Sequence, residues 1–223
     1  MIVLLFGPPG CGKGTQTPRI REFLGVPSIA TGAMLRQEIQ TGSRLGLQVE
    51  ALLRSGQFVG DTHMNRMLLR RLNQADCGHG VLLDGYPRTV PQAQFLDRII
   101  ARNGWPAPMI VHLEVPERTL LERVSGRRQC ARCHTSYNLF TAPPPQPDVC
   151  ACGTRLFERE DDRAGIVRAR LRAYREQTDP VLTHYRHVNV VEVDGDRDTD
   201  VVFAEIRGTL EDRMAPVRVR RAG

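Results

Sequence analysis

The chain begins MIVLLFGPPGCGKGT (residues 1–15), and this stretch decides the fold. Its first six residues are all apolar and stop at Gly7, which predicts a buried strand over residues 1–6. Open α/β folds bind their ligands beyond the carboxyl ends of such strands. We therefore expect a ligand site at residues 7–15.

Glycines recur through this site, and they permit positive φ angles that turn successive backbone N–H groups toward one anion. They are Gly7, Gly10, Gly12 and Gly14. The spacing from Gly7 to Lys13 matches the phosphate-binding P-loop, in which the lysine serves the β- and γ-phosphates. The usual hydroxyl comes one residue late, at Thr15, which opens a predicted helix whose dipole also favours an anion.

Composition limits the class of protein. The chain has 223 residues, 41% of them hydrophobic, and a net charge of +6. This length allows one core with one or two small insertions. Because no apolar run approaches the roughly 20 residues of a membrane span and no signal peptide precedes the first strand, we expect a cytoplasmic protein. Arginine supplies most of the positive charge, which suits nucleotides as well as nucleic acid.

Short apolar runs alternate with helical patterns along the chain. The runs cover residues 1–6, about 27–29, 81–84, 109–114 and 190–194. Helices are predicted over 61–76, with Asp61 as N-cap, and over 89–104, which ends on a C-cap glycine. This alternation predicts an α/β fold: a P-loop NTPase-like five-stranded parallel sheet with helices on both faces. Residues 30–59 and 126–158 do not fit the pattern and are interpreted as insertions.

Five motifs, taken together and in order, resemble the adenylate kinase family in its long-lid, zinc-binding bacterial form. They are GPPGCGKGT (7–15), ATGAMLR (30–36), LLDGYPRT (82–89), SGRRQC (125–130) and REDDRAGIVRARL (159–171). The resemblance implies reversible transfer of the γ-phosphoryl group of MgATP to AMP, giving two ADP, by a monomer. It also implies three parts: a core (1–29, 60–125 and 160–223), an NMP-binding insertion (30–59) and a lid (126–159).

The resemblance also implies the functional residues. Asp84 would hold water on Mg²⁺ near the hydroxyl of Thr15. The cations around the phosphates would be Lys13, Arg88, Arg127, Arg159 and Arg170. The ATP site would comprise Gly10, Cys11, Gly12, Lys13, Gly14, Thr15, Arg123, Arg127, Ser136, Tyr137 and the backbone of Arg197. The AMP site would comprise Thr31, Arg36, Gln57, Phe58, Val59, Gly85, Tyr86, Pro87, Arg88, Gln92, Arg159 and Arg170.

The resemblance also implies which residues recognise the adenine bases, and the sequence departs from the family pattern at one position. Gln92 would hydrogen-bond the adenine of AMP, and Arg123 would stack on the adenine of ATP. Tyr137 either lines the ATP site from the lid or belongs to the core of the lid. Ala33 stands where the family usually has an aspartate in the polar network near the metal and the phosphates, so we expect weaker catalysis.

Four of the six cysteines fall within one short segment. Cys130 and Cys133 have the two-residue gap of a zinc knuckle, and paired cysteines in a cytosolic chain indicate metal ligands before disulfides. Cys150 and Cys152 have only one residue between them, so the second half of the site is distorted or His134 replaces one sulfur. We expect a structural Zn²⁺ held by the four cysteines, although iron or cobalt also suits such a site.

Other functions remain open. A zinc-ribbon nucleic-acid-binding protein would use the cysteines and the arginine-rich tail at 213–221, but that interpretation leaves the P-loop and DGYPR without a role. A P-loop GTPase would need a guanine-reading NKxD motif, which the sequence lacks. The nearest alternative is a kinase for another nucleoside monophosphate. We expect ATP and AMP as substrates and neither nucleic acid nor membrane as a partner.

Overall fold

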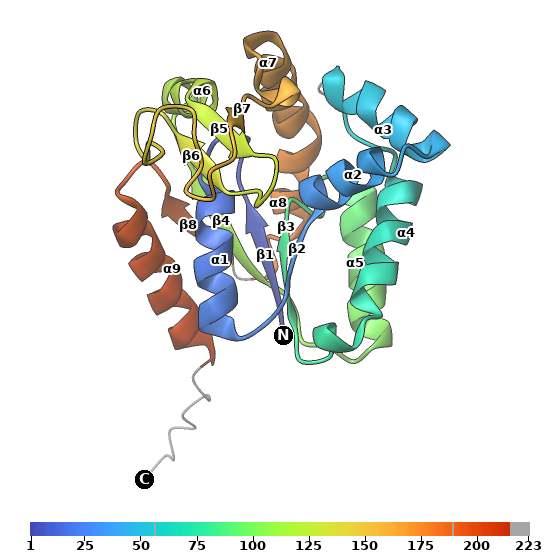
Figure 1. Ribbon diagram of the computed structural model, residues 1–223. Coiled ribbons are helices and arrows are strands. Elements are labelled where there is room, and N and C mark those ends of the chain that lie inside the picture. The colour runs from blue at the N-terminus through green and yellow to red at the C-terminus, as the bar shows by residue number, and fades with distance from the viewer. Residues whose placement is uncertain (56, 189, 215–223) are drawn as a thin grey trace.

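The computed structural model describes residues 1–55, 57–188 and 190–214, and a parallel β-sheet forms its centre (Figure 1). The strand order is β2-β3-β1-β4-β8, and every neighbouring pair is parallel. The strands are β1 (Ile2–Phe6), β2 (Ser28–Ala30), β3 (Val81–Asp84), β4 (Met109–Glu114) and β8 (Val190–Asp194). The predicted five-stranded parallel sheet is confirmed, with its second strand one residue later than expected.

The sheet is buried on both faces because successive side chains point into two different hydrophobic cores. Leu4 of β1 packs in the first core, whereas Val3 and Leu5 pack in the second core. Helices of the first core are α2 (Thr31–Gln40), α3 (Arg44–Arg54), α4 (Asp61–Leu72), α5 (Val90–Arg102) and α8 (Asp179–His184). Helices of the second core are α1 (Lys13–Leu24), α6 (Glu117–Ser125), α7 (Ala164–Ala173) and α9 (Thr199–Met214). Helices therefore cover both faces, as predicted.

The ends of two predicted helices differ from expectation. Helix α4 begins at Asp61 with Gly60 as its N-cap, so the expected capping role of Asp61 is wrong. It ends at Leu72, and a short 3₁₀ turn, η1 (Ala75–Cys77), follows. Helix α5 has Asn103 as its C-cap, and Gly104 comes next with a φ of 61°, which stops the helix.

The two stretches that interrupted the α/β pattern add no described strand to the parallel sheet. Residues 31–54 form α2 and α3. Residues 127–157 carry an antiparallel sheet of order β6-β5-β7, made of β5 (Arg127–Cys130), β6 (Ser136–Asn138) and β7 (Leu156–Phe157). Both lie beyond the carboxyl ends of the parallel strands, at the top of Figure 1. They therefore stand on two sides of the expected ligand site.

Two further turns complete the described chain: the 3₁₀ turn η2 (Glu160–Asp162) and the π-helical turn η3 (Tyr174–Thr178). In the described ranges, no helix is long and apolar enough to cross a membrane. The arginine-rich tail singled out in the sequence lies, from residue 215 onward, outside the described residues.

Candidate functional site

The loop between β1 and α1 has the backbone geometry of an anion site. Gly7, Gly10 and Gly12 have φ angles of 145°, 91° and 103°, whereas Gly14 lies in the first turn of α1. A Cβ atom at Gly12 or Gly14 would meet no other atom within 4 Å, so open space adjoins the loop there. Lys13 folds back over the loop and donates hydrogen bonds to the carbonyl oxygens of Gly7 and, at 3.1 Å, of Pro8. The predicted P-loop is therefore formed.

Three arginines predicted for catalysis come together on two aspartates. Arg127 donates to both carboxylate oxygens of Asp162, whose side chain is 0% exposed. Arg159 donates to Asp161 through Nε at 2.9 Å and through a second nitrogen, and Arg170 donates to Asp161 at 2.9 Å. We call Arg127, Arg159 and Arg170 the Asp-held arginines. Paired in this way, their guanidinium groups are fixed before any ligand arrives.

The pKa values of these groups follow from burial and charge together. Burial opposes the charge of Asp161, but Arg170 and Arg159 outweigh it and lower the pKa of Asp161 to about 2. Burial lowers the pKa of Arg170 to about 10, although Asp161 opposes the shift. Burial also acts to lower the pKa of Arg127, but the hydrogen bond to Asp162 outweighs this effect, so the pKa of Arg127 is raised. All of these groups are therefore charged at neutral pH.

Asp161→Asn is expected to lower the free energy of unfolding at pH 7, because it leaves buried guanidinium groups without their partner. The pKa of Asp161 is lower in the folded state, so its contribution is present above pH 3.8 and is lost as the pH falls toward about 2. That contribution is about 2 kcal/mol. Urea unfolding at pH 7, 5 and 3 should show the difference between wild type and variant shrinking toward acid pH.

The matched control is Asp200→Asn, which removes a carboxylate paired with Arg19 at an exposed position. An exposed pair contributes little, so this variant should unfold nearly like the wild type at every pH. A difference for Asp161→Asn that stays constant from pH 7 to 3 would contradict the expected role of its charge.

Two other predicted arginines are partly buried without a carboxylate partner among the described residues. The pKa of Arg36 is lowered to about 10, by burial first and then by the charge of Arg159. Burial also lowers the pKa of Arg88, whose Nε donates to the carbonyl of Gly85 at 2.8 Å. Its guanidinium lies 5.1 Å from the centre of the Phe58 ring. A buried cation without a counter-charge is costly, so an anionic ligand fits this place.

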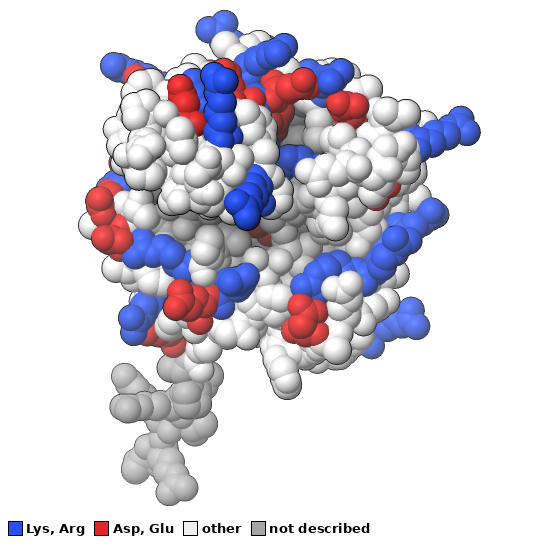
Figure 2. All heavy atoms as spheres, in the orientation of Figure 1, with Lys and Arg blue, Asp and Glu red and all other residues white. Residues whose placement is uncertain are grey.

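Seven residues predicted for the AMP site line one narrow cavity, whose empty space is about 300 Å³ when it is counted out to open solvent. They are Thr31, Gln57, Phe58, Val59, Gly85, Arg88 and Gln92. Leu35 of α2, Leu53 of α3 and Met64 of α4 complete its wall. Figure 2 shows this face of the molecule hollowed between the small antiparallel sheet and α2–α3, with basic and acidic side chains around the hollow. Two of the five sequence motifs, ATGAMLR and LLDGYPRT, therefore meet at one cavity.

Gln92 makes internal hydrogen bonds with both ends of its amide. Its Oε1 accepts from the backbone N–H of Arg88 at 2.8 Å, and its Nε2 donates to Asp61 at 2.8 Å. The side chain is buried at the wall of the cavity. An adenine that hydrogen-bonded to Gln92 would therefore have to replace one of these two partners.

The hydroxyl of Thr17, which the sequence did not single out, donates to a carboxylate oxygen of Asp84 at 3.2 Å. Thr17 lies on the buried face of α1, toward the sheet, whereas Thr15 is exposed. Asp84 ends β3, next to the P-loop strand β1. The donor set of a carboxylate and a hydroxyl suits hydrated Mg²⁺, which prefers oxygen ligands and keeps several waters.

The residues predicted for the base of ATP lie on the other side of the P-loop. Arg123 of α6 donates to the carbonyl of Gly195 at 2.8 Å and lies 3.4 Å from Asp196. The side chain of Arg197 pairs with Glu205 of α9. These contacts fix the loop that follows β8 against α6.

Of the two residues predicted on the lid side, Ser136 is exposed on β6, and Tyr137 packs inside the small sheet. The Tyr137 hydroxyl lies 3.4 Å from Sγ of Cys150 and accepts from the backbone N–H of Ala151 at 3.1 Å. Between the two alternatives left by the sequence, the structure places Tyr137 in the core of the lid.

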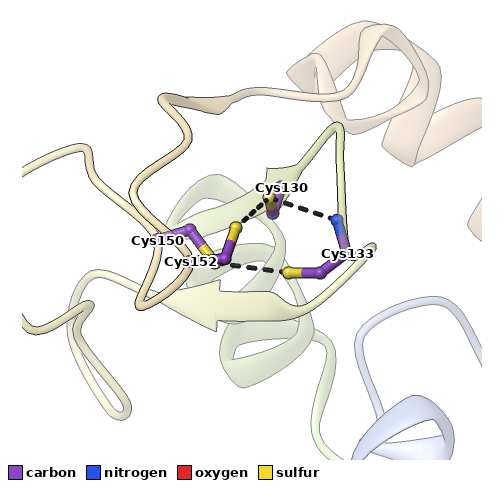
Figure 3. Close-up of side chains that lie close together, drawn as sticks. All are labelled: Cys130, Cys133, Cys150 and Cys152. Carbon is purple, nitrogen blue, oxygen red and sulfur yellow. Dashed lines mark hydrogen bonds between the residues drawn. The ribbon is translucent and has the colours of Figure 1, made fainter.

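The four cysteines converge at one end of the small sheet (Figure 3). Sγ of Cys130 is 3.5 Å from Sγ of Cys152, Sγ of Cys133 is 3.4 Å from Sγ of Cys150, and all four lie within 4.8 Å of one another. A tetrahedral ion with bonds of about 2.3 Å to sulfur separates the sulfurs by about 3.8 Å. The four sulfurs therefore fit a zinc-like ion.

The single-residue gap between Cys150 and Cys152 does not separate their sulfurs. A tight turn, with Gly153 at a φ of 80°, brings both to the same side. A hydrogen bond with Thr135 lowers the pKa of Cys133 to about 6, and Thr154 lowers the pKa of Cys152, which favours the thiolates that a metal needs. The described cluster contains no histidine, so the alternative with His134 as a ligand is not supported.

The sequence did not single out Asp161 and Asp162, the partners of the Asp-held arginines. The available signal was their position inside the motif REDDR, directly between two arginines. A buried aspartate needs a paired cation. Arg159 of the same motif and Arg170 supply it for Asp161, and the distant Arg127 supplies it for Asp162. This pairing decides which arginines of the segment are fixed.

A P-loop at the end of a central parallel strand, faced by buried arginines, defines a P-loop nucleotide-binding protein of the α/β class. Residues 5–190 match the family described as "Adenylate kinase". A protein named adenylate kinase from Methanosarcina mazei is 42% identical over 94% of this chain and 98% of its own. Another from Thermosipho melanesiensis is 43% identical over 92% of this chain and 97% of its own. The chain belongs to the adenylate kinase family.

Proposed function

We propose that this protein transfers the γ-phosphoryl group of MgATP to AMP, reversibly, and gives two ADP. The observation that carries the proposal is the pair Arg36 and Arg88, which are partly buried without a carboxylate partner among the described residues, with Arg88 at the wall of the pocket that the predicted AMP residues line. Membership of the adenylate kinase family and the names of the relatives support the same reaction.

Phosphoryl transfer asks little covalent chemistry of the protein, which must align donor and acceptor and neutralise the charge that spreads in the transition state. In this proposal Lys13 and the P-loop hold the phosphates of ATP, and Arg36 with Arg88 holds the phosphate of AMP. The Asp-held arginines neutralise the transferred group between them. Mg²⁺ bound with ATP would neutralise the β- and γ-phosphate oxygens, and Asp84 would hold its water ligands.

The domain arrangement is part of the proposal. Residues 30–59 would close over AMP and residues 126–159 over ATP, around a core of 1–29, 60–125 and 160–223. Closure excludes water, which would otherwise hydrolyse the donor. The four-cysteine site would carry a structural Zn²⁺ because four protein ligands leave no open position for a substrate. We take the active unit to be a monomer in the cytoplasm.

The test of this function is ADP formation from ATP with AMP, GMP, CMP or UMP as acceptor. AMP is expected to give the highest kcat/KM, with the reaction requiring Mg²⁺ and running in both directions. A tenfold preference for CMP or UMP would contradict the adenylate assignment and favour the alternative, a kinase for another nucleoside monophosphate.

Ala33→Asp is expected to raise kcat several-fold. Ala33 is exposed in the first turn of α2, which holds no acidic residue, and a carboxylate there is also favoured by the helix dipole. The added carboxylate would strengthen the network that holds water on Mg²⁺. The measurement is kcat and KM against MgCl₂ concentration. Gln37→Asp, one turn later on α2, is the matched control, and an unchanged kcat in Ala33→Asp would contradict the prediction.

A further inference from the structure

A second group of metal-ligating side chains lies on the parallel sheet, apart from the four cysteines. It consists of His112 and Glu114 on β4 and Glu192 on β8. One ring nitrogen and one oxygen of each carboxylate all lie within 4.8 Å of one another. His112 is the register partner of Glu192, and Glu114 is two residues further on the same strand. All three side chains therefore share one face of the sheet.

This group lines a groove of about 1360 Å³, counted out to open solvent, between the strand ends, α6, η3 and α8. The groove is acidic although the whole chain carries a net charge of +6. Its charged lining residues besides the group are Glu117, Asp179, Asp194, Glu205 and Arg175. Arg175 pairs with Glu117, and Arg197 pairs with Glu205 and Asp194. Among the described residues, Glu114 and Glu192 have no arginine or lysine partner.

The register of the strands brings carboxylates close together on this face. Glu114 lies directly opposite Asp194, and Glu192 comes two residues before Asp194. Arg197 pairs with Asp194, whereas among the described residues no arginine or lysine pairs with Glu114 or Glu192. A bound cation would relieve the repulsion between these two carboxylates.

His112 is oriented as a metal ligand. It is 9% exposed, its Nε2 lies 3.3 Å from the hydroxyl of Tyr174, and its Nδ1 lies 3.6 Å from Oε1 of Glu114. A proton on Nε2 donated to Tyr174 leaves the lone pair of Nδ1 facing Glu114. Metal-binding histidines commonly have such a partner on the other nitrogen. Tyr174 opens the π-helical turn η3, a type of turn that is frequent at functional sites.

We infer that His112, Glu114 and Glu192 bind a divalent first-row transition-metal ion such as Zn²⁺, with the remaining coordination positions open to water in the groove. An imidazole with two carboxylates suits Zn²⁺ and disfavours Mg²⁺, which prefers oxygen alone. The ligand atoms would draw together to about 3.4 Å, the separation set by tetrahedral bonds of about 2.1 Å. The side chain of Glu114 is 59% exposed, and Glu192 is also exposed, so both are free to rotate.

The test is equilibrium dialysis of the full-length protein against Zn²⁺ without nucleotide. The wild type should bind two ions per chain, one that resists dialysis into metal-free buffer and a weaker one. Glu192→Gln should weaken the affinity for the second ion by about tenfold or more and leave the affinity for the first ion unchanged. Glu205→Gln is the matched control, because it removes the same charge from the same groove at a residue that pairs with Arg197.

Three results would overturn the inference. The wild type could bind only one ion per chain, or Glu192→Gln could leave the affinity for the second ion unchanged. An equal loss of affinity in Glu205→Gln would mean that the acidic groove attracts cations in general. Ring-nitrogen NMR of the wild type gives a readout that does not depend on a variant. Zn²⁺ should shift the Nδ1 resonance of His112 and leave His184, which pairs with Asp97, unchanged. An unshifted His112 would also reject the site.

Discussion

Arg88→Ala is expected to lower kcat/KM for ADP formation by about three orders of magnitude, mostly through kcat. Arg88 is partly buried at the cavity wall, its Nε is fixed on Gly85, and no described carboxylate forms an ion pair with it. Its charge is therefore available to the phosphates, where it contributes most as negative charge spreads in the transition state. Steady-state kinetics with ATP and AMP in both directions measures the loss.

Two further variants make this test specific. Arg88→Lys keeps the charge but cannot reproduce a planar fork with two donors, so a large loss should remain. Arg98→Ala on α5 is the matched control, because Arg98 is exposed and lies over Phe95. A loss of tenfold or less in Arg88→Ala would place this residue outside the site.

Loss of the lid metal is expected to have the largest effect on stability. The small sheet has only Cys130, Cys150 and Leu156 as buried core residues, with Tyr137 against them. So small a core cannot hold three strands, and metal binding would supply much of the folding free energy of this segment. A chelator, or Cys152→Ser, should remove the tightly held ion and lower Tm by about 5 °C or more.

His134→Asn is the control for the lid, because His134 adjoins Cys133 but lies outside the described cysteine cluster. It should keep one tightly held ion and the Tm of the wild type. Binding of ATP to the P-loop should persist in Cys152→Ser, since the loop belongs to the second core. Variants Cys150→Ser and Cys152→Ser that both retain the ion at full affinity would reject the metal site.

The parallel sheet could be predicted because each of its strands is a short apolar run. A strand buried on both faces needs no polar alternation, so β1, β3 and β4 stand out from the helical patterns between them. The P-loop could be predicted equally well, because few structures other than an anion-binding loop require so many glycines around one lysine. The residues of the AMP site came from the resemblance to the adenylate kinase family, and seven of them line the cavity.

Contacts between distant segments could not be predicted in this way. The contact of Thr17 with Asp84 depends on which face of α1 turns toward the sheet. Tyr137 fitted both the lid core and the ATP site until its neighbours were known. The group of His112 and Glu192 joins two strands nearly eighty residues apart, and only strand order brings them together.

The division of the interior by the sheet has a consequence for how the protein holds two substrates. Residues that shape the AMP cavity, such as Leu35 and Met64, belong to the first core, whereas Cys11 of the P-loop and Leu171, next to Arg170, belong to the second. In the proposed reaction, AMP and ATP would thus be bound largely by separately packed halves, which are joined by the sheet and by contacts such as that between Arg54 and Glu160. A packing defect in one half is expected to weaken the binding of one substrate more than that of the other.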